Sequence, residues 1–199
     1  MQLKIMTFAL AGLLLLPYAA QAATYQIDNV HSSVEFSVRH LVAKTSGRFA
    51  NFSGTIEFDE KTLDQGQVSV VIDVASINTD NTDRDKHLRS PDFFDVETYP
   101  EITYEGSVSK KTDDGFHVAG TLTMHGVSRE VVLPVEFLGV GPGMRGETRA
   151  GFYAELKLNR KDYGIEWNKQ IDKGGWILGD EVTIRISIEA MAQPAHADK

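Results

Sequence analysis

The strongest constraint on the fold is a period-two alternation of apolar and polar residues that recurs along the chain. Such alternation gives a strand one buried face and one solvated face, which is typical of antiparallel sheets. A short candidate strand, residues 24–28, comes first. It is followed by eight clear segments at residues 34–38, 52–58, 68–74, 102–108, 118–124, 131–137, 152–158 and 182–188.

Short connections between these segments favour strands in hairpin succession. Residues 111–115 and 125–126 predict tight turns, and the Gly- and Pro-rich residues 139–146 predict a third turn. A sandwich and a closed up-and-down barrel both accommodate this order.

Small residues on the apolar face favour the barrel over the sandwich. Gly54, Gly106, Gly120 and Ala154 interrupt that face and would leave volume unfilled. The alternative is that the glycines relieve bending at barrel corners. The prediction is a mainly β protein, an antiparallel up-and-down β-barrel of about eight strands with a long apolar interior.

Residues 82–100 do not alternate and carry helix signals. Asn81 or Thr82 can cap a first turn, and Ser90 followed by Pro91 is a second start signal. The sequence therefore predicts one short helical excursion. Its charged first turn lies beside the apolar Leu88, Phe93 and Phe94, as expected of a segment that covers the mouth of a container.

The N-terminal segment predicts export. Lys4 precedes the apolar run 5–16, and Ala20-Gln21-Ala22 is a small-x-small cleavage site, so residues 1–22 read as a secretory signal peptide cleaved after Ala22. The expected domain is residues 23–192, followed by a polar tail at 193–199. The expected location is the periplasm if the source is a Gram-negative bacterium.

Composition narrows the function classes. The chain has no cysteine and a net charge of -8, so no disulfide framework is expected, and a phosphate-backbone partner such as nucleic acid is disfavoured. It lacks the sequence signatures of serine hydrolases, phosphate loops and dinucleotide sites. The six histidines have no metal-ligand spacing, so surface or hydrogen-bonded histidines are preferred over a scattered metal site. No catalytic residue, metal or cofactor is predicted.

Two groups of polar residues have open interpretations. Arg84 and His87, at positions i and i+3, either form a solvated helix face or contact a ligand head group. Arg160 and Asp162 either hold a structural corner after a strand or belong to the same mouth.

Several motifs together resemble the YceI-like family of periplasmic, polyisoprenoid-binding proteins. They are HLRSPDFFD at 87–95, GTLT at 120–123 followed by Gly126, and RKDYG at 160–164, with His31, Phe36, His40, Gly47, Arg149 and Phe152. The resemblance covers about residues 24–190. It implies a lipocalin-like barrel that encloses isoprenoid quinone precursors, prenyl phosphates or other long-chain lipids, with no established catalytic activity.

The resulting hypothesis is an exported, non-catalytic binding protein that holds a long-chain isoprenoid for transport or storage. An enzyme acting on a hydrophobic molecule through His40, His87 or Asp162 is the alternative, and a filled barrel that binds another protein is a third possibility. Transient membrane contact and a homodimer are left open. A bulky residue at Gly120 is expected to block loading while the fold stays intact.

Candidate contacts follow from alternation and position. The lipid tail is predicted to contact Phe36, Val38, Val70, Ile72, Leu88, Phe93, Phe94, Tyr104, Leu122, Val135, Phe152, Leu156, Ile184 and Ile186. The head group at the mouth is predicted to contact His40, Arg84, His87, Arg89, Arg160, Trp167 and Trp176.

Overall fold

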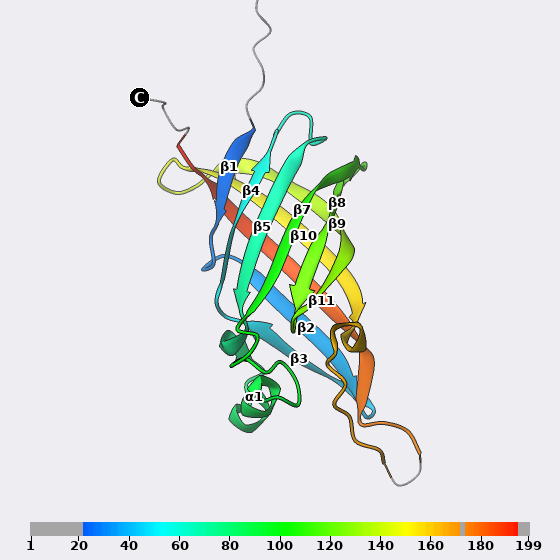
Figure 1. Cartoon of the computed structure of the whole chain (residues 1–199). Helices are drawn as coiled ribbons and strands as arrows, with labels where there is room; N and C mark the ends of the chain where they lie inside the picture. The colour runs from blue at the N-terminus through cyan, green and yellow to red at the C-terminus, as the bar shows by residue number, and fades with distance from the viewer. Residues whose placement is uncertain (1–21, 172–173, 195–199) are drawn as a thin grey trace, which may run out of the picture.

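The computed structural model describes residues 22–171 and 174–194, which form a closed antiparallel β-barrel (Figure 1). Residues 1–21 of the predicted signal peptide and residues 195–199 of the predicted tail lie outside the described residues. The strands are β1 (Ala23–Ile27), β2 (Ser33–His40), β3 (Ala43–Phe49), β4 (Phe52–Phe58), β5 (Gly66–Asp73), β6 (Ile77–Asn78), β7 (Glu101–Lys111), β8 (Gly115–Met124), β9 (Val127–Pro142), β10 (Thr148–Asn159) and β11 (Leu178–Ala192). The helices are η1 (Val74–Ser76), α1 (Thr82–Arg89) and η2 (Arg160–Tyr163).

The barrel has eight strand positions although these strands number eleven, because three positions are each built from two strands in line. β1 and β2 share one position, β3 and β4 the next, and β5 and β6 the third. The long β11 closes the barrel by pairing with β2 along its first part and with β1 along its last part. The predicted up-and-down barrel is confirmed.

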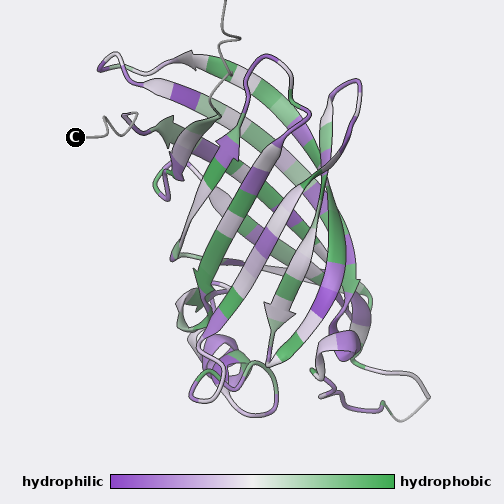
Figure 2. Cartoon of the chain, turned by 45° about the horizontal axis from the view of Figure 1, so that its top comes forward, coloured by the Kyte–Doolittle hydropathy of each residue, from purple (hydrophilic) through white to green (hydrophobic). Residues whose placement is uncertain are grey.

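The hydropathy pattern places the core inside the barrel. Along most strands, apolar and polar residues alternate in Figure 2. The apolar residues of these strands make up the core cluster and most of the cavity lining. The strand β3 was missed in the sequence because its inward positions include Thr45 and Gly47 rather than a run of large apolar residues.

Two turn predictions have different outcomes. The predicted turn at His125-Gly126 is confirmed: Met124 pairs with Val127, and both turn residues have positive φ, 52° and 74°. The predicted turn at residues 139–146 begins too early, because β9 continues to Pro142. The chain reverses only over residues 143–147.

The helical excursion is shorter than predicted. Asn81 caps α1 by accepting a hydrogen bond from the backbone N–H of Arg84 (2.9 Å), as predicted. The second start signal at Ser90-Pro91 does not begin a helical turn. The backbone N–H groups of Phe94, Asp95 and Val96 instead donate back to carbonyls of residues 88–90, which folds this segment into turns against the end of α1. None of the helices in the described part of the chain has the length and apolar character needed to cross a membrane.

Candidate functional site

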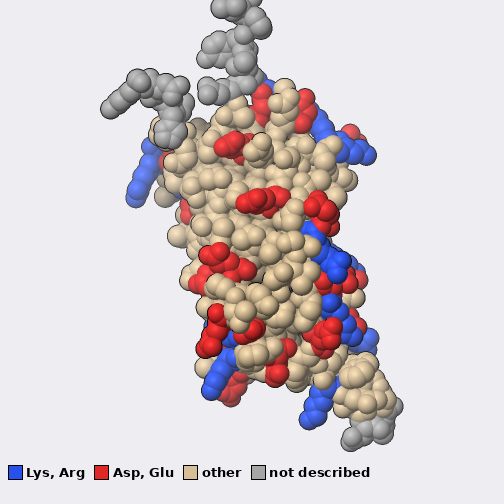
Figure 3. Space-filling view, viewed as in Figure 1, with Lys and Arg blue, Asp and Glu red and all other residues tan. Residues whose placement is uncertain are grey.

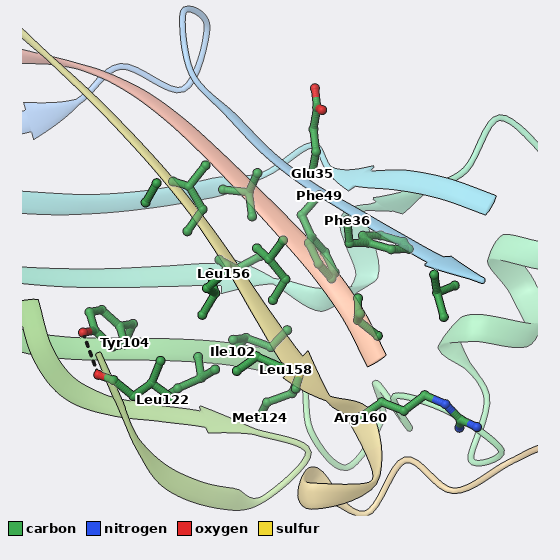
Figure 4. A pocket seen from close by; sticks show the side chains of 18 of the residues that line it. Glu35, Phe36, Phe49, Ile102, Tyr104, Leu122, Met124, Leu156, Leu158 and Arg160 are labelled. Atoms are coloured by element: carbon green, nitrogen blue, oxygen red, sulfur yellow. Dashed lines mark hydrogen bonds between the residues drawn. The ribbon is translucent and has the colours of Figure 1, made fainter. Parts of the chain in front are cut away.

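The barrel encloses an apolar cavity of about 430 Å³. Its lining comes from the inward faces of the strands, from α1 with the turns that follow it, and from the segment between η2 and β11. In Figure 4 the side chains of Tyr104, Leu122, Met124, Leu156 and Leu158 converge on this space, whereas Glu35 points away from it. Every residue predicted to contact the tail lines the cavity: Phe36, Val38, Val70, Ile72, Leu88, Phe93, Phe94, Tyr104, Leu122, Val135, Phe152, Leu156, Ile184 and Ile186. That they contact a lipid remains a prediction.

One end of the cavity is closed by aromatic rings, here called the floor cluster: Tyr25, Phe58, Phe116, Phe137 and Phe152. Phe58 is 1% exposed, and its ring centroid lies 4.9 Å from that of Tyr25 and 5.3 Å from that of Phe152. Only Phe116 and Phe152 of this cluster line the cavity, so the other rings stand behind them. The cavity is therefore a pocket with a packed base.

The hydroxyl groups at this depth are already occupied. Tyr104 donates from its hydroxyl to the carbonyl of Val118 (2.9 Å), and burial raises the pKa of Tyr104 to about 12. Tyr25 donates to Glu60, and burial raises the pKa of Tyr25 above its usual range. Neither hydroxyl is an available acid or base near neutral pH.

The other end is covered by three rings, here called the mouth cluster: His87, Phe93 and Trp167. Their centroids lie 4.9–5.0 Å apart in all three pairs. His87 and Phe93 come from α1 and the turns after it, whereas Trp167 comes from the segment after η2. His87 is fixed from outside by Asp92, whose Oδ2 lies 2.9 Å from its Nε2. The two covering segments thus meet through side-chain contacts of all three rings.

Arg84 lines the mouth, and two of its guanidinium nitrogens also bind Thr79. Its Nε donates to Thr79 Oγ1 (2.8 Å) and its Nη2 to the Thr79 carbonyl (2.7 Å). The buried Asp85 accepts from the N–H and hydroxyl of the same Thr79 (2.9 and 2.5 Å). These bonds tie the start of α1 to the strand that precedes it.

Arg160 is a structural residue whose side chain also reaches the cavity. It is 5% exposed and donates to the carbonyls of Gly179, Ile165 and Trp167 (3.0, 2.7 and 2.8 Å). Burial lowers the pKa of Arg160, and the nearby Asp180 opposes that shift. The corner interpretation describes its contacts best, because two carbonyls of the covering segment and one of β11 accept hydrogen bonds from this guanidinium.

Two residues expected at the mouth lie elsewhere. Arg89 donates from Nε to the carbonyl of Ala75 (2.8 Å) and from Nη2 to that of Ile77 (2.7 Å), because its helix face is turned to η1 and β6. Trp176 is 60% exposed and does not line the cavity. Asp162, part of the enzyme alternative, is exposed and also outside the lining, whereas His40 and His87 belong to it.

The glycines do not create the cavity. A Cβ on Gly54 would lie 2.3 Å from the Ser69 carbonyl oxygen, and one on Gly120 would lie 2.3 Å from that of Glu105. Gly106 is similarly crowded by Val118. Neighbouring strands approach too closely for a side chain at these glycines, so the prediction that they leave volume unfilled is wrong; that they relieve bending at corners stays a prediction. The expectation that a bulky residue at Gly120 preserves the fold is wrong. Of the four small residues, only Ala154 lines the cavity.

Sequence reasoning missed lining residues that do not belong to an alternating strand. Phe49 ends the unrecognised β3, while Ile165 and Ile177 flank the segment between η2 and β11. The apolar character of residues 165, 167 and 177 in a long connection was the available signal.

A group of possible metal ligands lies at the break between β1 and β2. One ligand atom each of Asp28, His31 and Glu189 lies within 4.8 Å of the others. The guanidinium of Arg149 binds the acidic members of this group: it donates to Asp28 (2.8 Å) and to Glu189, and also to the nearby Glu147 (2.9 Å). The hydrogen bonds from His31 and then Arg149 hold the pKa of Asp28 well below its usual range. The cluster reads as an ion-pair network that ties β1 to β10 and β11.

Fold and cavity together define a hollow antiparallel barrel with one packed end and one end covered by side chains, the architecture of barrels that enclose a hydrophobic molecule. The YceI-like domain family matches residues 25–190. The chain belongs to this family.

Relatives agree with this assignment. Protein YceI of Salmonella arizonae is 37% identical over 97% of this chain and 100% of its own length. The crystal structure of Burkholderia cenocepacia BcnA superposes with a TM-score of 0.72 at 26% identity, covering 82% of this chain and 98% of that one. A polyisoprenoid binding domain from Saccharophagus degradans has the same fold, with a TM-score of 0.65 at 19% identity over 86% of this chain and 99% of that domain.

Proposed function

We propose that this protein is an exported, non-catalytic binding protein that holds a long-chain isoprenoid or similar lipid in its barrel for transport or storage. The observation that carries the proposal is the apolar cavity itself, which is lined along its length by aliphatic and aromatic side chains and packed at its base. A flexible apolar chain is the ligand that gains most from such a lining, at about 25 cal/mol per Å² of buried area.

The mouth supports a ligand with a polar end. His40, Arg84 and His87 lie on the cavity lining at the covered end, while the deeper lining is almost wholly apolar. A prenyl chain inserted tail first would place its head group beside these three side chains. That a protein of the same fold is described as a polyisoprenoid binding domain agrees with this cargo class. Export rests on residues 1–22, whose sequence has the three parts of a cleavable signal.

The test is to purify the mature protein from the compartment to which it is exported, extract it with organic solvent and identify what is released by mass spectrometry. The expected result is a near-stoichiometric long-chain prenyl species. An empty protein that also fails to take up prenyl alcohols would contradict the proposal. Turnover of a hydrophobic substrate that is lost in His87→Ala while binding persists would favour an enzyme instead.

A further inference from the structure

The hairpin between β2 and β3 ends in two exposed apolar residues. His40 pairs with Ala43, so Leu41 and Val42 form a two-residue turn, in which they are 40% and 99% exposed. Leu41 has a φ of 52°, a conformation that at this turn position is normally taken by Gly, Asn or Asp. The turn at His125-Gly126 follows that preference in its Gly. Neither the positive φ of Leu41 nor the solvent exposure of Leu41 and Val42 favours apolar side chains at this turn.

More exposed apolar side chains lie next to this turn. The backbone N–H of Leu41 donates to the carbonyl of Ile177 (2.8 Å), which joins the hairpin to the segment that holds Trp176 and Ile171. Trp176 is 60% and Ile171 37% exposed. We call Leu41, Val42, Ile171 and Trp176 the rim patch. Figure 1 shows the β2–β3 turn and the described residues 165–171 and 174–178 at the end of the barrel that carries α1.

The rim patch is continuous with the cavity mouth. His40 precedes Leu41 and Ile177 follows Trp176, and both His40 and Ile177 line the cavity. A surface that covered the rim patch would therefore lie directly against the opening through which a cargo must pass.

Charge around the rim patch is positive although the chain is acidic overall. Arg39 pairs with Lys44 across the hairpin, a juxtaposition of like charges that costs stability, and residues 39–44 contain no acid. In sequence, the segment 165–177 on the other side of the patch carries two lysines and two acids, so residues 39–44 and 165–177 together have a net charge of +2. In Figure 3 the described part of the projecting segment is mostly tan, with Lys and Arg atoms beside it, whereas acidic groups are spread over the barrel wall.

We propose that the rim patch inserts into the head-group region of an anionic lipid bilayer and holds the cavity mouth against it; this rests on the proposed function. Exposed Trp and aliphatic side chains flanked by cations are the features that bind this region of a membrane. A membrane fits better than a protein partner because the patch is small. A typical protein interface uses about 20–30 residues from each partner, far more than the patch offers. Cargo would then pass between bilayer and barrel without crossing water.

The test measures co-flotation of the protein with vesicles of phosphatidylglycerol and phosphatidylethanolamine, and with phosphatidylcholine vesicles for comparison. The double variant Leu41→Gly/Val42→Asn places Gly at the positive-φ position and a polar residue after it, so the fold is retained or stabilised. We expect its partitioning onto anionic vesicles to fall about tenfold or more, and that of Trp176→Ser to fall as well. The control is Leu138→Asn, which changes a side chain 58% exposed near the C-terminal end of β9, a strand that does not contribute to the rim patch, and should have no effect.

Three results would overturn the proposal: wild-type protein that does not float with anionic vesicles, equal flotation of the rim-patch and control variants, or a dimer that the rim-patch variant dissociates without any vesicle binding. Lipid extracted from each variant is measured in parallel. A variant that keeps its cargo and loses flotation supports docking. A protein that floats through the rim patch and yet never holds a prenyl lipid would contradict the proposed function while docking stands.

Discussion

Filling the cavity at Ala154 is the sharpest test of an interior binding site. Ala154 is 5% exposed, lines the cavity and pairs with Val135 and Ile186, which line it too. Replacing it with Phe puts a six-carbon ring into space that a bound prenyl chain would fill with roughly one five-carbon unit. At about 0.8 kcal/mol per buried CH₂, the loss is up to about 4 kcal/mol of binding free energy, or about a thousandfold in Kd.

The assay is uptake of a graded series of prenyl alcohols, from farnesol to solanesol, by delipidated protein. Ala154→Phe should weaken the longer alcohols most, because the ring shortens the usable depth, and thermal stability should change little since the ring enters open space. Ala119→Phe is the matched control: Ala119 lies on β8 between the inward-facing Val118 and the packed Gly120, and it is not part of the lining. Equal affinity of Ala154→Phe and the control for every alcohol would refute the interior site.

Further expectations concern the packed strands, the mouth, the corner and the ion-pair network. Gly120→Phe should fail to fold, because a Cβ there would meet the Glu105 carbonyl oxygen at 2.3 Å; a folded variant by circular dichroism would contradict this. Trp167→Ala removes two ring contacts of the mouth cluster, worth about 1–3 kcal/mol together, and should speed cargo release to cyclodextrin about 5- to 150-fold, whereas Trp176→Ala should not. Arg160→Met leaves buried carbonyls without donors and should destabilise the fold by about 3–5 kcal/mol in urea unfolding; a loss below about 1 kcal/mol would argue against the corner role. Because its pKa is lowered on folding, Asp28 contributes stability above its unfolded pKa of about 4 and loses that contribution as the pH falls below it; Asp28→Asn should therefore flatten the dependence of the urea midpoint on pH in that range, and an unchanged slope would count against the network.

The cavity-facing residues were the part of the site that the sequence could predict. Alternation assigns each strand residue to one of two faces, so Phe36, Leu122 and Ile184 could be placed inside before their neighbours were known. The caps of α1 and the His125-Gly126 turn were predictable for a similar reason, since both depend on residues close in sequence.

Residues whose role depends on distant backbone could not be placed. Arg84, Arg89 and Arg160 look alike in sequence, yet only the tertiary structure shows that Arg89 holds the carbonyls of residues 75 and 77 and that Arg160 holds those of residues 165, 167 and 179. The role of the glycines could not be predicted for the same reason. A glycine in a strand indicates either open space or a close approach of neighbouring backbone, and the Glu105 carbonyl beside Gly120 shows that close approach applies there.

What the sequence by itself determined is therefore the strand periodicity, the up-and-down order and the inward face, because these follow from local alternation and turn chemistry. Which end of the barrel is packed was decided only by tertiary structure. Tyr25, Phe58 and Phe152 come from three separate strands and form the floor cluster only when the barrel closes. His87, Phe93 and Trp167 are likewise brought together across some 80 residues of chain, because closure places the two covering segments over the same opening.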